Sequence, residues 1–151
     1  MTTGEQQDGP SDAELKAAAA ELRMVTSQLL RRLRSAEPGF QVSPTQFAVL
    51  SRLSTKGAQT TADLARAERM RPQSMRTTLV PLEELGLIKR VPHPTDGRQS
   101  LVSLTPEGEQ QVRSNRSVRE SWLVHAMTER LSPSEQRRLI DSVGLLSRLL
   151  D

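Results

Sequence analysis

The sequence predicts a mainly α-helical chain with one small β-hairpin. Apolar residues recur at spacings of three and four over most of its length, which is the period of an amphipathic helix. Between residues 87 and 104 this period gives way to two short segments rich in β-branched residues, separated by a loop of Pro, Thr, Asp and Gly. With 151 residues, the chain has the length of one ordinary domain.

The composition excludes several classes of protein. The charged fraction of 26% and the hydrophobic fraction of 35% are ordinary for a globular chain, and the absence of cysteine excludes disulfides, thiolate metal sites and cysteine-based peroxide sensing. The first ten residues lack the basic start and apolar run of an export signal, and no run of 18 apolar residues occurs. We therefore expect a cytoplasmic protein with no membrane association.

The first helix is predicted from Ser11 onward, after a polar tail over residues 1–10 that we expect to be disordered. Ser11 and Glu14 have the spacing of a capping box, and Glu37-Pro38-Gly39 ends the helix after about Ala36. Its apolar positions follow one face: Leu15, Ala18, Leu22, Val25, Leu29 and Leu33.

Three further helices are predicted where Ser or Thr precedes Pro, because proline fits the first helical position. These starts are Ser43-Pro44, Thr105-Pro106 and Ser132-Pro133, and they predict helices that end near residues 57, 131 and 150. One domain is expected over residues 11–151, with dimerisation helices at about 12–36 and 105–150 and a reading head at about 43–104.

The central third predicts a helix-turn-helix followed by a wing. A short helix starts at Thr60 or Thr61, and a second helix follows Arg71-Pro72 and stops at Gly86. The hairpin at residues 87–104 comes directly after it, and this order is that of a winged helix-turn-helix, an architecture that reads DNA. The inward residues are expected to be Leu64, Ala65, Met75, Leu79, Leu82 and Leu85.

The second of these helices has a polar face suited to reading base edges. From Arg66 to Arg98 there are seven basic and four acidic residues, a net charge of +3 that equals the excess of the whole chain. A solvated surface is the alternative interpretation of these arginines. Arg71 precedes Pro72, whereas Ser or Thr precedes the proline at the other Pro-initiated helices. Either the first backbone amides of this helix are left free to bind a phosphate, or the helix begins slightly later and Ser74 caps it. The face consists of Arg71, Gln73, Ser74, Arg76, Thr77 and Thr78.

Four segments of this region form one specific combination. They are Leu64-Ala65, the run from Leu82 to Arg90, Asp96-Gly97-Arg98, and the run from Val102 to Gly108. The combination resembles the multiple antibiotic resistance regulator (MarR) family of winged helix-turn-helix transcriptional regulators. The resemblance implies a homodimer whose two heads bind a pseudo-palindromic double-stranded DNA operator, most often as a repressor.

The resemblance also assigns contacts to individual residues. Arg98 would enter the minor groove, and Asp96 would fix this arginine or its loop. Arg90 lies where some members hold an anionic ligand, and a phosphate contact is the alternative for it. Residues 39–42 would line a crevice for a small aromatic or amphipathic effector. Base contacts are implied for Gln73, Ser74, Arg76 and Thr77, and phosphate contacts for Thr61 and Arg69.

Pro81 departs from the common pattern, because a proline inside the recognition helix is expected to kink it. The sequence indicates no cofactor: His93 and His125 lie far apart without a carboxylate cluster, and no catalytic constellation or phosphate-binding glycine loop occurs. We therefore expect no enzyme. A nonspecific nucleoid-type DNA binder and a winged-helix protein-interaction adaptor remain as alternatives.

Overall fold

The computed structural model describes residues 9–36, 39 and 42–151. Residues 1–8 of the tail expected at 1–10, and residues 40 and 41 of the crevice expected at 39–42, therefore lie outside the described residues. The chain divides into two compact units, Met1–Ala36 and Glu37–Asp151. The first holds one helix, α1 (Asp12–Ser35), which begins with the predicted capping box of Ser11 and Glu14. None of its side chains is buried.

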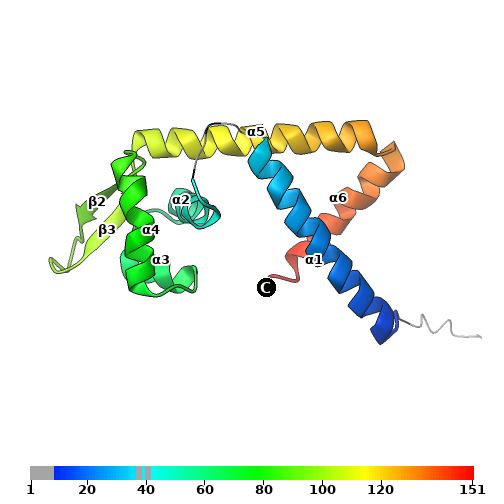
Figure 1. Cartoon of the computed structure of the whole chain (residues 1–151), viewed down its shortest axis with the longest axis horizontal. Helices are drawn as coiled ribbons and strands as arrows, with labels where there is room; N and C mark the ends of the chain where they lie inside the picture. Colours follow the sequence, from blue (N-terminus) through cyan, green and yellow to red (C-terminus); the bar gives the residue numbers. More distant parts are fainter. Residues whose placement is uncertain (1–8, 37–38, 40–41) are drawn as a thin grey trace, which may run out of the picture. The chain divides into compact units, whose positions relative to one another are not determined.

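The second unit begins with α2 (Pro44–Lys56), β1 (Gln59–Thr60), α3 (Thr61–Ala67) and α4 (Pro72–Glu84). The hairpin of β2 (Ile88–Pro92) and β3 (Ser100–Leu104) follows, and then come α5 (Pro106–Arg130) and α6 (Pro133–Ser147). Figure 1 shows α2, α3, α4 and the hairpin beside the start of α5. Residues 42–112 are called the winged head below. The predicted mainly helical, winged helix-turn-helix fold is thus confirmed.

The sheet has one strand more than predicted. β1 pairs antiparallel with β3, giving the order β1-β3-β2, and Arg90 of β2 lies opposite Val102 of β3. The sequence predicted only the hairpin, because a two-residue strand such as Gln59–Thr60 is too short to show an alternating pattern.

A single apolar core holds the winged head together. Residues from α2, α3, α4, the sheet and the first turns of α5 meet in it, as the spacing predicted for Leu64, Met75 and Leu79. Leu85 is the exception and is 60% exposed, because α4 ends at Glu84 and Leu85 lies in its C-cap. The core consists of Val49, Leu50, Leu53, Leu64, Ala65, Met75, Leu79, Leu82, Leu87, Ile88, Val102, Leu104 and Val112.

The three predicted Ser-Pro and Thr-Pro starts are all present as side-chain-capped helix N-termini. Pro81 lies inside α4 as predicted, and the helix nonetheless runs on to Glu84. Within the described residues, no helix combines the length and apolar character that a membrane crossing requires.

Candidate nucleic-acid interface

The turn between α3 and α4 sets the helix-turn-helix. Thr60 caps α3 by accepting a hydrogen bond from the Asp63 amide at 3.1 Å. The turn is closed where the Met70 amide donates to the Ala65 carbonyl at 2.8 Å. Arg69 takes a φ of +53° there, a left-handed conformation that usually falls to glycine. An exposed arginine is thus held in a costly backbone conformation at the turn.

α4 separates an anchoring face from a polar face. Met75 and Leu79 are completely buried, whereas Gln73, Ser74, Arg76 and Thr77 are exposed, as the periodicity predicted. The hydroxyl of Thr77 donates to the Gln73 carbonyl at 3.2 Å. Toward an outside group this hydroxyl is therefore an acceptor, whereas Gln73 and Arg76 supply N–H donors.

The start of α4 differs from every other helix start in the described part of the chain. Arg71 is the N-cap and makes no side-chain capping bond, whereas Ser or Thr caps each of the other five helices. The first amides of an α-helix have no partner within the helix. The exposed Arg71 side chain therefore stands beside backbone donors at the positive end of the helix dipole.

The wing loop between β2 and β3 is organised by Asp96 and His93. Asp96 accepts the Arg98 amide through Oδ1 at 3.0 Å and the Gln99 side-chain amide through Oδ2 at 3.3 Å. His93 Nδ1 accepts the amides of Thr95 and Asp96 at 3.3 and 3.1 Å. Of the two options that the sequence left open, Asp96 fixes the loop, and the exposed Arg98 guanidinium has no ion pair among the described residues.

A basic hollow of about 380 Å³ lies where these parts meet. Three arginines reach it from different elements: Arg76 from α4, Arg90 from β2 and Arg98 from the wing loop. Such a concentration of guanidinium groups attracts anions, and phosphate most of all because of its matching geometry. The remaining lining residues are Thr60, Thr61, Ala62, Gln99 and Ser100.

The basic hollow gathers only part of the predicted site. Arg69, Arg71 and Gln73 are exposed on α4 and the turn but do not line it. The sequence interpretation left out Thr60 and Gln99, although the Thr60-Thr61 pair and the polar loop were visible. It left Arg90 open between an anionic ligand and a phosphate contact, and the structure has Arg90 in the same hollow as Arg76 and Arg98.

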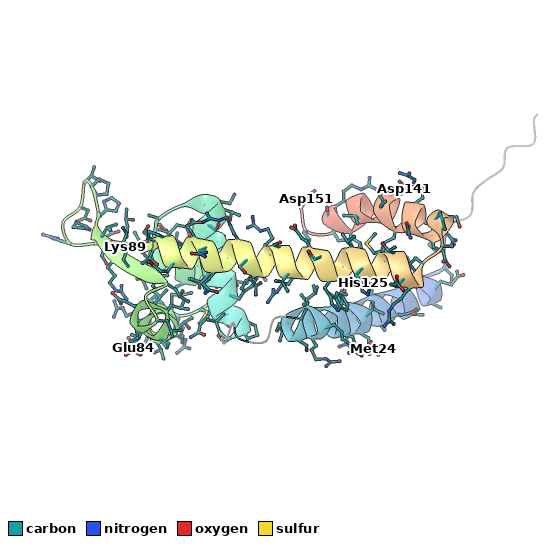
Figure 2. All side chains as sticks on the ribbon, turned by 90° about the horizontal axis from the view of Figure 1, so that it is seen from above. Met24, Glu84, Lys89, His125, Asp141 and Asp151 are labelled. Atoms are coloured by element: carbon teal, nitrogen blue, oxygen red, sulfur yellow. The ribbon has the colours of Figure 1, made fainter. Side chains whose placement is uncertain are left out.

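One ion pair connects the end of α4 to the sheet. Arg90 Nε donates to Glu83 Oε2 at 3.2 Å, and the two side chains are 34% and 42% exposed. Figure 2 labels the neighbouring Glu84 at the end of α4 and Lys89 on β2. Glu84 makes no ion pair in the described part of the chain.

Polar residues of α5 also approach the winged head, and sequence analysis missed them. The Arg119 guanidinium lies 4.1 Å from the centre of the Phe47 ring, a cation–π contact between α5 and α2. Asn115, one turn earlier, is 1% exposed. Their four-residue spacing from each other was the available signal, but polar pairs at this spacing are common on solvated helices.

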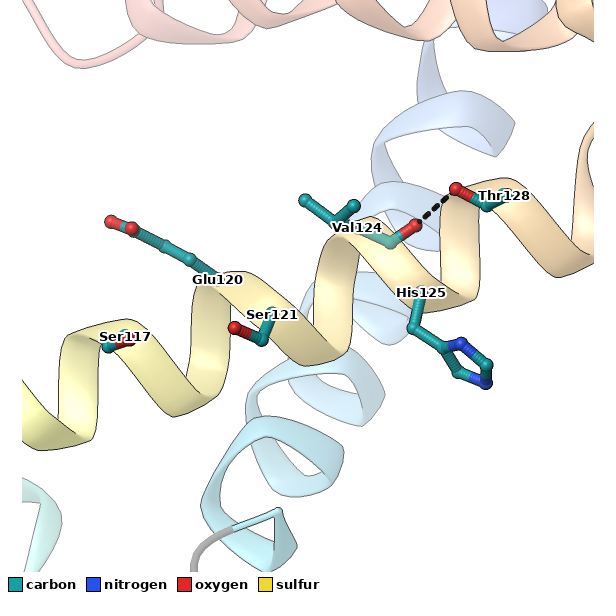
Figure 3. Close-up of a pocket in the computed structure, with 6 residues that line it drawn as sticks. All are labelled: Ser117, Glu120, Ser121, Val124, His125 and Thr128. Carbon is teal, nitrogen blue, oxygen red and sulfur yellow. Dashed lines mark hydrogen bonds between the residues drawn. The ribbon is translucent and has the colours of Figure 1, made fainter.

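A second hollow lies on α5 alone. Figure 3 shows Ser121, Val124 and His125 among its lining residues, and the Thr128 hydroxyl donates to the Val124 carbonyl at 2.9 Å. Across the described residues, no three His, Asp or Glu side chains gather as metal ligands would.

A helix-turn-helix with a basic wing defines a class of protein, the winged-helix DNA-binding proteins. The model of the MarR family matches residues 42–100. An HTH-type transcriptional regulator of Mycobacterium bovis, Mb0904, is 38% identical over 93% of this chain and 96% of its own length. ML2140 of Mycobacterium leprae is 37% identical over the same shares. The chain belongs to the MarR family of DNA-binding transcriptional regulators.

Solved structures agree with this assignment. A transcriptional regulator of Pseudomonas aeruginosa superposes with a TM-score of 0.81 at 38% identity, over 94% of this chain and 99% of that one. MepR, a transcription regulator of the Staphylococcus aureus multidrug efflux pump MepA, has the same fold with a TM-score of 0.74 at 19% identity, over 88% of this chain and 98% of its own.

Proposed function

We propose that this protein is a sequence-specific regulator that binds a pseudo-palindromic operator as a homodimer and represses transcription until a small aromatic or amphipathic ligand relieves it. Membership of the family by itself leaves the operator, the dimer, the sign of regulation and the effector open. A regulator of this kind acts where the chromosome is, in the cytoplasm.

The main support for the proposed DNA contact is the basic hollow. It lies between the recognition helix and the wing, and three arginines from separate elements line it. A DNA backbone carries one negative charge for about every 1.7 Å of helix axis, so such a cluster gains affinity when counterions leave the phosphates. In our proposal, phosphates of the operator approach the arginines of this hollow.

The exposed face of α4 would then lie in the major groove. Gln73 and Arg76 suit adenine and guanine edges, respectively, and Ser74 and Thr77 suit either type of base. Arg98 would enter a narrow minor groove, with Asp96 holding its loop in shape. Phosphate contacts are proposed for Thr61, Arg69 and Arg71, the last together with the uncapped start of α4.

The exposed apolar residues of the flanking helices α1 and α6 are the reason for proposing a homodimer. Leu22 and Leu29 of α1, and Val143 and Leu146 of α6, are all exposed although each lies on the apolar stripe of an amphipathic helix. Contiguous apolar faces are rarely left in water by a monomer. We propose that a second copy of the chain covers them, which would also give two recognition helices for two half-sites about one DNA turn apart.

The position of Arg90 favours an effector that is an anion. Arg90 is one of the residues that line the basic hollow, so a small carboxylate ligand bound there would compete directly with a phosphate. A ligand in the crevice near residues 39–42 would act differently, by changing the separation of the two heads. In both cases an effector lowers DNA affinity only through a difference in its binding to the free and DNA-bound states.

The test is an electrophoretic mobility assay on the purified protein, with its own promoter region and an unrelated duplex of equal length, at two salt concentrations. We expect the promoter to be preferred by roughly a thousandfold, with steep weakening in salt. Arg76→Ala and Arg98→Ala should each weaken promoter binding about tenfold or more. Arg130→Ala, at the far end of α5, is the control and should change little.

Two other outcomes would favour the alternatives. Equal, salt-sensitive binding to both duplexes would indicate a nucleoid-type protein. No binding to either duplex, and no effect of the two arginine variants, would favour an interaction adaptor that uses the wing to hold another protein.

A further inference from the structure

The basic hollow poses an electrostatic problem for Arg90. Arg76 and Arg98 line the same hollow, and like charges so close repel one another. An arginine side chain also has about four rotatable bonds and loses considerable entropy when it is held in one place. An unassisted Arg90 would therefore spend much of its time turned away from the hollow.

Glu83 counters both effects. Its carboxylate accepts the Nε–H of Arg90 at 3.2 Å, from the second-last residue of α4. A guanidinium is planar and carries five N–H donors in a fixed fork, so a bond at Nε leaves the four outer N–H groups to donate elsewhere. The backbone of Arg90 is fixed as well, since it pairs with Val102 inside the sheet.

We propose that Glu83 is a positioning residue for DNA binding, which holds the Arg90 guanidinium so that its outer edge faces phosphate in the basic hollow. The inference rests on the proposed DNA contact of this hollow and adds a residue that carries the wrong charge for touching DNA. An ion pair this exposed contributes little to folding, so its consequence is the orientation of Arg90.

The sign of one substitution tests this inference. Removing a carboxylate from a DNA-binding head reduces general repulsion and should tighten binding. A positioning residue has the opposite effect, because the neutral amide of Gln accepts the Arg90 Nε–H less strongly than a carboxylate does and Arg90 is partly released. We therefore expect Glu83→Gln to weaken binding of the promoter duplex about fivefold and to reduce the salt slope by up to about one, as loss of one phosphate contact does.

Glu84→Gln is the matched control, since Glu84 is the next residue, has the same charge and makes no ion pair among the described residues. It should leave binding unchanged or slightly tighter. Arg90→Ala should weaken binding at least as much as Glu83→Gln, and the double variant Glu83→Gln/Arg90→Ala should match Arg90→Ala alone, because the carboxylate acts only through the arginine. Thermal unfolding of each variant checks that the fold is retained.

The outcomes separate the two proposals. If the unsubstituted protein binds the promoter but Glu83→Gln behaves like Glu84→Gln, the positioning inference is wrong and the proposed function stands. An additional loss in the double variant beyond Arg90→Ala would also overturn it, since Glu83 would then act independently of Arg90. If the unsubstituted protein fails to bind the promoter, the proposed function itself fails.

Discussion

The winged head and the flanking helices α1 and α6 bury their apolar residues very differently. All buried apolar side chains of the described residues lie between Val49 and Val112. Neither α1 nor α6 has a buried residue, although both are strongly amphipathic. Because helix stability in water comes mainly from packing of an apolar face, the head can hold its own structure and the flanking helices need a partner surface.

This difference in burial suggests a separate role for each of the two regions, a division of work between them. The head fixes the relative positions of α4 and the wing through its own core, independently of any second chain. The apolar stripes of the flanking helices would set the separation of two such heads if a second copy covers them. Predictions that change one region and leave the other intact can therefore test the division.

The largest effect is expected from a charge on the α6 stripe. Val143→Glu would bury a carboxylate at the proposed dimer contact, and an unpaired buried charge costs several kcal/mol, at least roughly 3. We expect the dimer to dissociate at micromolar concentration and promoter affinity to fall at least a hundredfold. Sedimentation equilibrium measures the first and a mobility assay the second.

Leu145→Glu is the control for this prediction. Val143 and Leu145 are both 55% exposed in the single chain, but Leu145 lies about a third of a turn away from the stripe of Leu139, Val143 and Leu146. Dissociation by Val143→Glu alone would locate the contact on the stripe. A dimer that survives Val143→Glu would show that the α6 stripe does not form the contact between the two copies.

Two helix glycines offer the next contrast. A Cβ on Gly108 would lie 2.0 Å from the Leu87 carbonyl oxygen, whereas a Cβ on Gly144 of α6 would meet nothing within 4 Å. Gly108→Ala must push the first turn of α5 away from the sheet, at a cost of about 3 kcal/mol. Gly144→Ala only removes backbone entropy from the unfolded chain and should stabilise by up to about 1 kcal/mol.

Urea unfolding measures both changes in stability: the urea concentration at the unfolding midpoint should fall for Gly108→Ala and rise for Gly144→Ala. A midpoint for Gly108→Ala equal to that of the unsubstituted protein would mean that the close approach to Leu87 is relieved without cost.

A smaller effect is expected at the turn of the winged head. Arg69 is held at a φ of +53°, which costs an L-residue roughly 1 kcal/mol relative to glycine. Arg69→Gly should therefore raise the melting temperature by about 2–4 °C and weaken DNA binding several-fold. Arg69→Ala is the matched variant: it loses the same charge but keeps the strain. Equal melting temperatures for the two variants would show that the turn carries no strain.

The sequence predicted those parts of the fold that depend on local chemistry. Ser11 with Glu14, Ser43 with Pro44 and Ser132 with Pro133 marked helix starts correctly, because a capping residue acts within one turn. The prediction that Leu85 points inward was wrong, since apolar spacing does not show where a helix ends. β1 was missed, because its two residues become a strand only by pairing with β3.

The candidate site was predictable as a set of residue types but not as an arrangement. Spacing on α4 was enough to predict that Gln73 and Arg76 are exposed. That Arg90 and Arg98 line one hollow with Arg76, and that Glu83 pairs with Arg90, depends on how the sheet packs beside α4. Contacts between residues distant along the chain leave no trace in one sequence.

The smallest expected effect is a difference in acid sensitivity between the helix starts of the flanking helices and those of the head. The side chain and then the backbone amide of Ser11 hold the pKa of Glu14 below its ordinary value through hydrogen bonds. At Glu135 the backbone amide of Ser132 lowers the pKa most, followed by its side chain. In the head, Gln46 occupies the same position of the α2 capping box and does not titrate.

A carboxyl whose pKa is lowered by folding adds stability above its unfolded pKa, and this stability is lost as the pH falls through its folded pKa. Acidification below about pH 4.5 should therefore weaken the starts of α1 and α6 while sparing α2. Between pH 7 and about pH 3, which extends below the ordinary carboxyl pKa, the melting temperature of the double variant Glu14→Gln/Glu135→Gln should fall less than that of the unsubstituted protein. The reason is that Gln keeps the hydrogen bonds as Gln46 does. Glu21→Gln/Glu129→Gln, with the same change in charge, should not reproduce that protection; if it does, net charge and not capping governs the acid response of the flanking helices.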